Sequence, residues 1–230
     1  MAHLTFDCIS ADGVRTRSFY ARNLVLAGWT GRDREALQHH IDELAELGIP
    51  GPTTTPMFYR CGVGLVTQTP VLQVLGPDTS GEVEYVLIAM DDGLWVTVGS
   101  DQTDRRQEAA IGIAMSKQLG GKVLAREAWR VDEVAMHWDQ IALRAWVTIG
   151  GERVPYQDAT LGQIKSPLDL ISGWTGGGSS LPDGTIMMGG TPAAIGGVRP
   201  AARFEMELSD PVLGRSITAG YDIETLQVIA

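Results

Sequence analysis

Three acidic residues, Glu82, Glu84 and Asp101, have the types and the spacing of a divalent-metal site. Successive side chains of a β-strand point to opposite faces, so Glu82 and Glu84 in SGEVEYVLI project from the same face. Neighbouring carboxylates repel each other unless they are solvated or share a counter-ion, and their oxygens suit Mg²⁺ or Mn²⁺. On its own, however, the E-x-E spacing is more often the wet face of an ordinary antiparallel strand.

A predicted β-hairpin returns Asp101 toward the two glutamates. Residues 85–90 are apolar, residues 91–93 (DDG) are a hairpin signal, and residues 94–98 are again β-prone. Asp101 follows the second strand, so we expect it beside the residues at the start of the first strand.

The rest of the chain predicts a mainly β protein with a few helices, of the α+β class. Apolar alternation and turn residues predict strands within residues 3–20, 24–27, 57–76 and 139–157, and again from residue 184 onward. A surface helix is predicted from about residue 31 to 47. A second helix, rich in Ala, Met and Ile and therefore expected to be buried, is predicted from about residue 103 to 119.

Composition limits the classes of function. The 230 residues are 44% hydrophobic and 20% charged, which is typical of a soluble globular protein, and no apolar run approaches the roughly 20 residues that span a bilayer. The N-terminal residues lack the apolar core of a signal peptide, so we expect a cytoplasmic protein. A formal charge of −10 argues against nucleic acid and anionic membranes as partners.

Three motifs, in this order, resemble those of the fumarylacetoacetate hydrolase superfamily. They are EVE at 82–84, SDQTDR at 100–105 and GGTP at 189–192. The resemblance extends over residues 24–228, and the overall pattern is also similar to the DUF2848 branch. It implies the mixed β-sandwich roll of that superfamily in a single domain, 1–230, and a homodimer. Residues 1–75 would form N-terminal strands and a covering helix, and residues 76–230 the metal-binding core.

The resemblance also implies roles for individual residues. Glu82, Glu84 and Asp101 would hold Mg²⁺ or Mn²⁺. His40 and Glu43, in an H-x-x-E spacing, lie about 60° apart around the first helix and would activate water.

Further residues resemble family positions that act on the substrate. Lys117 would neutralise a developing oxyanion, with Lys122 as a substitute. Contacts to the substrate would come from four more positions: Arg105, Gln157, Gly190 and Thr191.

This chain departs from the family pattern at three places. Ser100 stands where the family has Asn, Gly189 stands where it has Thr, and the segment GWTGRDR at 28–34 lacks the usual Tyr and His. Substrate contacts are therefore expected to differ from those of the family even where the metal ligands are retained.

The implied function is that of a divalent-metal-dependent hydrolase. It would cleave a carbon–carbon bond in a small anionic 2-oxo or 1,3-dicarbonyl acid through a metal-stabilised enolate. A decarboxylase, hydratase or tautomerase on the same scaffold is an alternative, because these reactions need the same enolate stabilisation. The departures from the motifs also leave open a non-catalytic subunit or sensor that binds a small anion or a metal.

Overall fold

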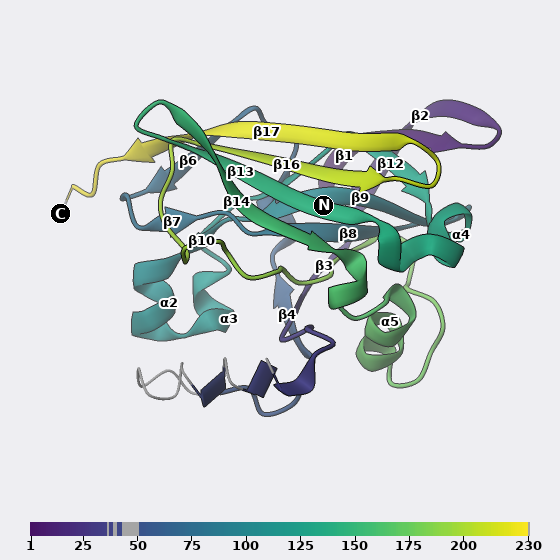
Figure 1. Ribbon diagram of the computed structural model, residues 1–230, viewed down its shortest axis with the longest axis horizontal. Coiled ribbons are helices and arrows are strands. Elements are labelled where there is room, and N and C mark those ends of the chain that lie inside the picture. The colour runs from purple at the N-terminus through teal and green to yellow at the C-terminus, as the bar shows by residue number, and fades with distance from the viewer. Residues whose placement is uncertain (36, 39–40, 43–50, 230) are drawn as a thin grey trace.

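The computed structural model describes residues 1–35, 37–38, 41–42 and 51–229, and about half of them lie in β-strands (Figure 1). Within this part of the chain the strands form a ten-stranded sheet, a five-stranded sheet and a two-stranded ribbon. The predicted fold class, mainly β with a few helices, is confirmed.

The ten-stranded sheet contains both parallel and antiparallel neighbours and carries the acidic hairpin at its centre. Its main path runs through β2 (Gly13–Ala21), β1 (Ala2–Ser10), β12 (Glu127–Arg130), β9 (Gly93–Asp101), β8 (Val83–Met90), β15 (Thr185–Met188), β3 (Asn23–Gly28) and β4 (Met57–Cys61). Two short strands lie off this path: β11 (Lys122–Leu124) pairs with β9, and β5 (Val66–Thr67) pairs with β11. The predicted hairpin is confirmed as β8 and β9.

The five-stranded sheet lies over the hairpin and is built mostly from the C-terminal half (Figure 1). Its order is β14 (Glu152–Thr160), β13 (Ala142–Ile149), β16 (Arg203–Asp210), β17 (Arg215–Leu226) and β6 (Val71–Leu75). Both β16 and β17 contact β9, so the two sheets pack face to face. The ribbon of β7 (Thr79–Ser80) and β10 (Thr103–Asp104) lies beside one end of this pair.

Strand β8 is buried on both faces, so it separates two apolar layers. Val83, Tyr85 and Leu87 belong to the cluster between the two sheets, which we call the inner layer. Val86 and Ile88 belong to the cluster on the opposite face, the outer layer. Since alternate residues of a strand share a face, Glu84 lies on the side of the outer layer.

The helices lie at the margins of the sheets. They are α2 (Arg105–Ile111), α3 (Ile113–Ser116), α4 (Val131–Val134) and α5 (Pro167–Thr175), with short 3₁₀ turns at Val63–Leu65, Ala135–Gln140 and Leu161–Gln163. Of the helix predicted over 31–47, the described positions 34–35, 37–38 and 41–42 are helical. No helix in the described ranges is long and apolar enough to cross a membrane.

The prediction of one buried helix over 103–119 is wrong. The segment forms two short helices interrupted at Gly112, of which α2 buries no residue and α3 buries only Ser116. Ile111 and Met115 remain exposed. Burial requires a facing apolar surface, and among the described residues of these two helices Ile113 alone packs against an apolar cluster, that of the outer layer.

Strands from the first 75 residues enter both large sheets. β1 to β5 join the ten-stranded sheet, whereas β6 joins the five-stranded sheet beside β17. The predicted division at residue 75 therefore does not coincide with a boundary between layers. The single-domain organisation stays a prediction.

Candidate metal and oxyanion site

The hairpin brings Glu82, Glu84 and Asp101, the acidic triad, together at its open end, where β8 begins and β9 ends. One carboxylate oxygen from each lies within 4.8 Å of the other two. Glu84 and Asp101 are buried, and the Glu82 side chain is 15% exposed. Glu82 lies one residue before β8, but the Asp101 N–H donates to its carbonyl at 2.9 Å and so continues the ladder. The expected convergence of the three carboxylates is thus present.

Two lysines contact opposite oxygens of Asp101. The Lys122 Nζ lies 2.6 Å from Oδ1, while the Lys117 Nζ is bonded to Oδ2 and lies 3.5 Å from Glu82 Oε2. Lys122 is fully buried and also donates to the Gln102 carbonyl at 3.1 Å. The Lys117 side chain retains 10% exposure, so it is the lysine that can reach a ligand.

Arg105, at the start of α2, connects the triad to a pocket. Its Nη2 lies 2.8 Å from Glu82 Oε1, and its Nε donates to Ser80 Oγ at 2.7 Å. The helix begins here because Asp104 caps it by accepting a hydrogen bond from the Gln107 N–H. The resulting guanidinium position is fixed by three elements of the fold, namely α2, β7 and the start of the hairpin.

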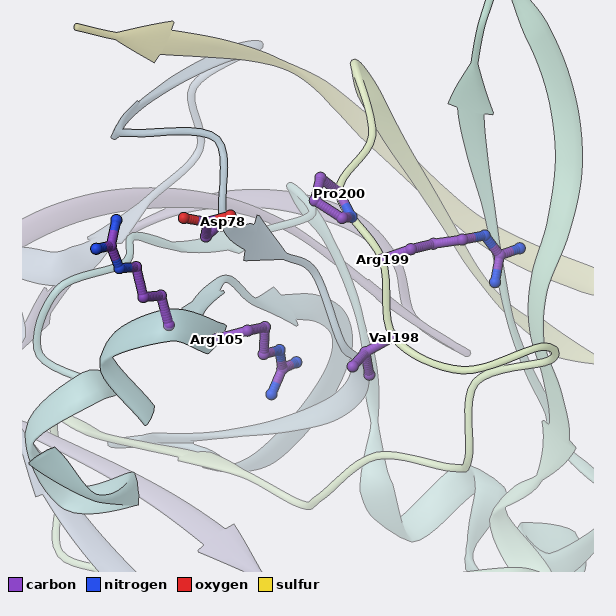
Figure 2. Close-up of a pocket in the computed structure, with 6 residues that line it drawn as sticks. Asp78, Arg105, Val198, Arg199 and Pro200 are labelled. Carbon is purple, nitrogen blue, oxygen red and sulfur yellow. The ribbon is translucent and has the colours of Figure 1, made fainter. Parts of the chain in front are cut away.

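The pocket has a volume of about 390 Å³, and three of its six lining residues are arginines. It is lined by Asp78, Arg105, Arg106, Val198, Arg199 and Pro200. Figure 2 shows the Arg105 side chain reaching from the start of α2 toward the 198–200 segment. Arg105 is therefore shared by the pocket and the acidic triad.

The carboxylates of the triad differ in their proton affinity. Burial raises the pKa of Glu84 well above its usual range, and the Asp101 carboxylate adds to this effect. Burial also favours the neutral form of Asp101, but Lys117 and Lys122 outweigh it and hold the pKa of Asp101 below its usual range. Arg105, followed by Lys117, likewise lowers the pKa of Glu82 against the effect of burial.

Lys117 is held in its charged form. Burial would lower the pKa of this ammonium group, but Asp101 and Glu82 outweigh it and raise the pKa above the usual lysine value. A permanently charged ammonium group beside the triad is suited to stabilising negative charge that develops on a ligand.

The closing turn predicted at 189–192 lies directly against Glu84. The Gly190 N–H donates to Glu84 Oε2 at 2.6 Å. Gly190 has a φ of 93°, and a Cβ there would lie 1.9 Å from Thr30 Oγ1, so glycine is required. A Cβ on Gly189 would lie 2.2 Å from the Tyr85 ring, which accounts for the absence of a larger residue at this turn.

Gln157 ties the closing turn to the hairpin. Its Oε1 accepts from the Val83 N–H at 2.9 Å, and its Nε2 donates to Thr191 Oγ1 and to the Pro192 carbonyl, both at 2.6 Å. Gln157 is 2% exposed. Its amide is thus engaged within the protein, whereas the partly exposed Thr191 can still meet a ligand.

Two of the predicted catalytic residues, His40 and Glu43, lie outside the described residues. Lys122 was predicted only as a substitute for Lys117, yet it contacts the same Asp101 carboxylate. Its position at the start of the short apolar strand KVL was the sequence feature that could have indicated a buried lysine. Tyr221, whose hydroxyl hydrogen-bonds to Ser100 and Gln102 on either side of Asp101, was not predicted to belong to the site.

The donor set fits a hard divalent cation. Three carboxylates, each with an oxygen within 4.8 Å of the others, provide the oxygen ligands that Mg²⁺ and Mn²⁺ prefer. Lys117 already supplies positive charge between Asp101 and Glu82, so a cation would share these two carboxylates with it. The triad could therefore hold a divalent metal.

Residues 27–221 match the family model described as "Protein of unknown function (DUF2848)". The chain belongs to the DUF2848 family. No curated protein sequence matches it.

Solved structures of the fumarylacetoacetate hydrolase family share its fold. A candidate fumarylacetoacetate isomerase/hydrolase from Oleispira antarctica has a TM-score of 0.65 and 18% identity, covering 97% of this chain and 100% of that one. For a candidate fumarylpyruvate hydrolase from Burkholderia cenocepacia the values are 0.64 and 16%, with 98% and 93% covered. For the 2-hydroxyhepta-2,4-diene-1,7-dioate isomerase from Mycobacterium marinum they are 0.63 and 15%, with 98% and 99% covered. The fold expected from the sequence motifs is confirmed.

Proposed function

We propose that this DUF2848 protein is a divalent-metal-dependent hydrolase that cleaves a carbon–carbon bond in a small 2-oxo or 1,3-dicarbonyl acid. The observation that carries the proposal is the acidic triad with Lys117 beside it and with Arg105 shared between the triad and a pocket lined by three arginines. The names of the structural neighbours, which include a candidate fumarylpyruvate hydrolase, support the same class of reaction.

Glu82, Glu84 and Asp101 would hold Mg²⁺ or Mn²⁺. When bound, such a metal supplies Lewis-acid polarisation of a carbonyl oxygen and orients a chelating substrate. The residues of this chain supply the remaining parts of the chemistry, and each follows from its position.

Lys117 is the group best placed to stabilise an enolate. Its ammonium group is held charged by Asp101 and Glu82, and its side chain is partly exposed. Hydrogen-bond donors that are fixed before the reaction stabilise developing negative charge without having to reorient. Arg105, which lines the pocket, would bind a carboxylate of the substrate. Thr191, which is partly exposed, would donate to another substrate oxygen.

Hydrolysis also requires a base that activates water. His40 and Glu43 are our candidates for it, on their H-x-x-E spacing alone. Without such a base, the same site supports isomerisation of an enol acid, because that reaction needs only proton transfer and enolate stabilisation. The isomerase from Mycobacterium marinum, with its nearly complete mutual coverage, makes this the second candidate.

A thermal-shift titration tests the metal site. Chelator-treated protein would be titrated with Mg²⁺ or Mn²⁺, with and without oxalate as an enolate mimic. At a cation concentration 100 times Kd, binding stabilises the folded state by about 2.7 kcal/mol, or about 5–10 °C for a chain of this size. Glu84→Gln should abolish the shift, whereas Asp210→Asn, a buried carboxylate outside the triad, should retain it.

A substrate screen then tests the reaction. The wild type would be incubated with a panel of 2-oxo and 1,3-dicarbonyl acids in the presence of the metal, and consumption and products would be measured by mass spectrometry. Turnover that disappears in Glu84→Gln and in Lys117→Met supports the hydrolase. Metal binding without turnover of any acid would contradict it and favour a non-catalytic binding protein.

A further inference from the structure

Tyr221, on β17 of the five-stranded sheet, reaches across the inner layer to the end of β9. Its hydroxyl lies 2.8 Å from Ser100 Oγ and donates to Gln102 Oε1 at 2.7 Å. Ser100 and Gln102 are the two residues that flank Asp101 in the chain. All four residues are 0% exposed.

The direction of these hydrogen bonds can be assigned. A carbonyl oxygen such as Gln102 Oε1 only accepts, so the tyrosine O–H is donated to it and Ser100 must donate to the tyrosine oxygen. The Gln102 Nε2 donates in turn to Thr79 Oγ1 at 2.8 Å, on β7. The network is thus continuous from one sheet to the other, and each of its members has at least one hydrogen-bond partner.

The network approaches Asp101 from the side opposite to its carboxylate. The side chains of Ser100 and Gln102 point toward Tyr221 in the inner layer. The Asp101 side chain points the other way, toward Lys117 and Lys122. The backbone that carries Asp101 is therefore fixed on both sides by one hydroxyl group from the second sheet.

Packing alone does not account for this hydroxyl. The Tyr221 ring packs beside Phe204, with ring centroids 5.8 Å apart, and a phenylalanine would fill the same space. Burying a hydroxyl is costly unless it is hydrogen-bonded. Tyr156, whose ring also packs beside Phe204 with centroids 5.9 Å apart, has a buried hydroxyl with no hydrogen-bond partner among the described residues. It provides a matched control for Tyr221.

We propose that Tyr221 is a positioning residue that orients Asp101 for the divalent cation. This inference rests on the proposed function in one respect, that the acidic triad binds a cation. Partners that orient metal ligands without touching the metal typically change its affinity about 10–100-fold when they are removed. Tyr221 holds its ligand through the backbone on both sides, so the loss of its hydroxyl should weaken cation binding within this range.

The test is a titration of the full chain with Mn²⁺, followed by electron paramagnetic resonance of the free ion at a temperature well below the unfolding midpoint of every variant. Tyr221→Phe should raise the Kd for Mn²⁺ about 10–100-fold. Tyr156→Phe, which also removes a buried hydroxyl, should leave the Kd unchanged. A purely structural role of Tyr221 would lower the unfolding midpoint but leave the Kd at the wild-type value, and that result would overturn the inference.

Ser100→Ala provides a second variant with a smaller perturbation, in case Tyr221→Phe does not fold. It removes the same hydrogen bond from the other end and should also weaken Mn²⁺ binding. If both residues act through one network, the double variant should raise the Kd for Mn²⁺ by less than the product of the two single-variant increases. Independent effects would contradict the network.

The outcomes separate this inference from the proposed function. A wild-type protein that binds no Mn²⁺ would overturn both. A wild type that binds Mn²⁺ with the same Kd as Tyr221→Phe and Ser100→Ala would overturn the role of Tyr221 alone.

Discussion

Two clusters of buried charge lie in different parts of the sandwich and differ in how their carboxylates are satisfied. The acidic triad lies near α2 and β10, whereas Asp210 lies near α4, where β16 ends (Figure 1). Asp210 is a lone buried carboxylate that accepts from the N–H groups of Val212 and Leu213 at 3.0 and 3.1 Å. His137 Nε2 lies 3.0 Å from its other oxygen.

The difference separates a structural carboxylate from a candidate ligand set. One oxygen of Asp210 accepts from two N–H groups of the turn that follows β16, and the other lies beside His137 and 3.6 Å from Arg215 Nε, so its role is to hold that turn. In the triad three carboxylates converge, and burial leaves Glu84 with a raised pKa while Asp101 is held ionised. Carboxylates that converge repel one another, and groups with strongly shifted proton affinity are enriched at functional centres.

The largest expected effect is a loss of folding stability when Lys122, the fully buried lysine that contacts Asp101, is replaced. Lys122→Met keeps the length of the side chain but leaves Asp101 Oδ1 and the Gln102 carbonyl without their ammonium donor. Removing one partner of a buried ion pair typically costs about 3–5 kcal/mol. Urea denaturation should show this loss, whereas Lys165→Met, at a partly exposed position, should change the free energy of unfolding by about 0.5 kcal/mol or less.

If Lys122→Met were as stable as the wild type, Asp101 would not depend on this buried lysine. The two clusters would then be equally tolerant of charge removal, and the distinction between them would fail.

An intermediate effect is expected from the titration of Glu84. Its folded-state pKa is raised, so its contribution to stability is full below the unfolded-state pKa and is lost as the pH rises through the folded-state value. Glutamine does not titrate. In chelator, the wild type should therefore lose stability relative to Glu84→Gln as the pH rises, by up to about 1.4 kcal/mol per pH unit.

Urea denaturation at a series of pH values measures this difference. A constant difference between the two proteins from acidic to neutral pH would contradict the raised pKa of Glu84.

The smallest effect is expected at Asp210, with the opposite sign in pH. Burial would raise the pKa of Asp210, but the hydrogen bond with His137 and those from the backbone lower it. Its stabilisation is thus present above the unfolded-state pKa and is lost as the pH falls through the folded-state pKa. Asp210→Asn keeps one acceptor oxygen, so it should cost about 1 kcal/mol at neutral pH.

The difference between Asp210→Asn and the wild type should shrink as the pH falls below the ordinary aspartate pKa of 3.8. Chemical denaturation from neutral to acidic pH checks this trend. A cost that grows with acidity, or a loss of Mn²⁺ binding in Asp210→Asn, would undo the contrast between the clusters.

Much of the fold could be read from local patterns. The DDG turn between two apolar runs predicted the β8–β9 hairpin, and that hairpin alone brings Asp101 to Glu82 and Glu84. Helix α5 was missed although Ser166, Pro167 and Asp169 form a capping box with proline at its start. This helix-start signal was overlooked because the glycines at 173 and 176–178 favour a loop.

Other features of the site could not be read from the sequence, because they depend on contacts between distant segments. Tyr221 lies 120 positions after Asp101, and only the packing of the two sheets places its hydroxyl between Ser100 and Gln102. Similarly, Lys122 acquires its partner only when β11 pairs with β9. Neither hydrophobic periodicity nor a turn signal encodes such a pairing.

The sequence by itself determined the identity and order of the acidic triad, its hairpin and the mainly β class, since strand alternation and turn chemistry act over a few residues. The tertiary structure alone decided which cationic side chains contact each carboxylate, which face of α2 stays exposed, and that Tyr221 fixes the backbone of Asp101 from the side opposite to its carboxylate. These depend on burial and on strand pairing across the sheets, where Coulomb interactions strengthen as water is excluded. Local sequence does not specify that environment.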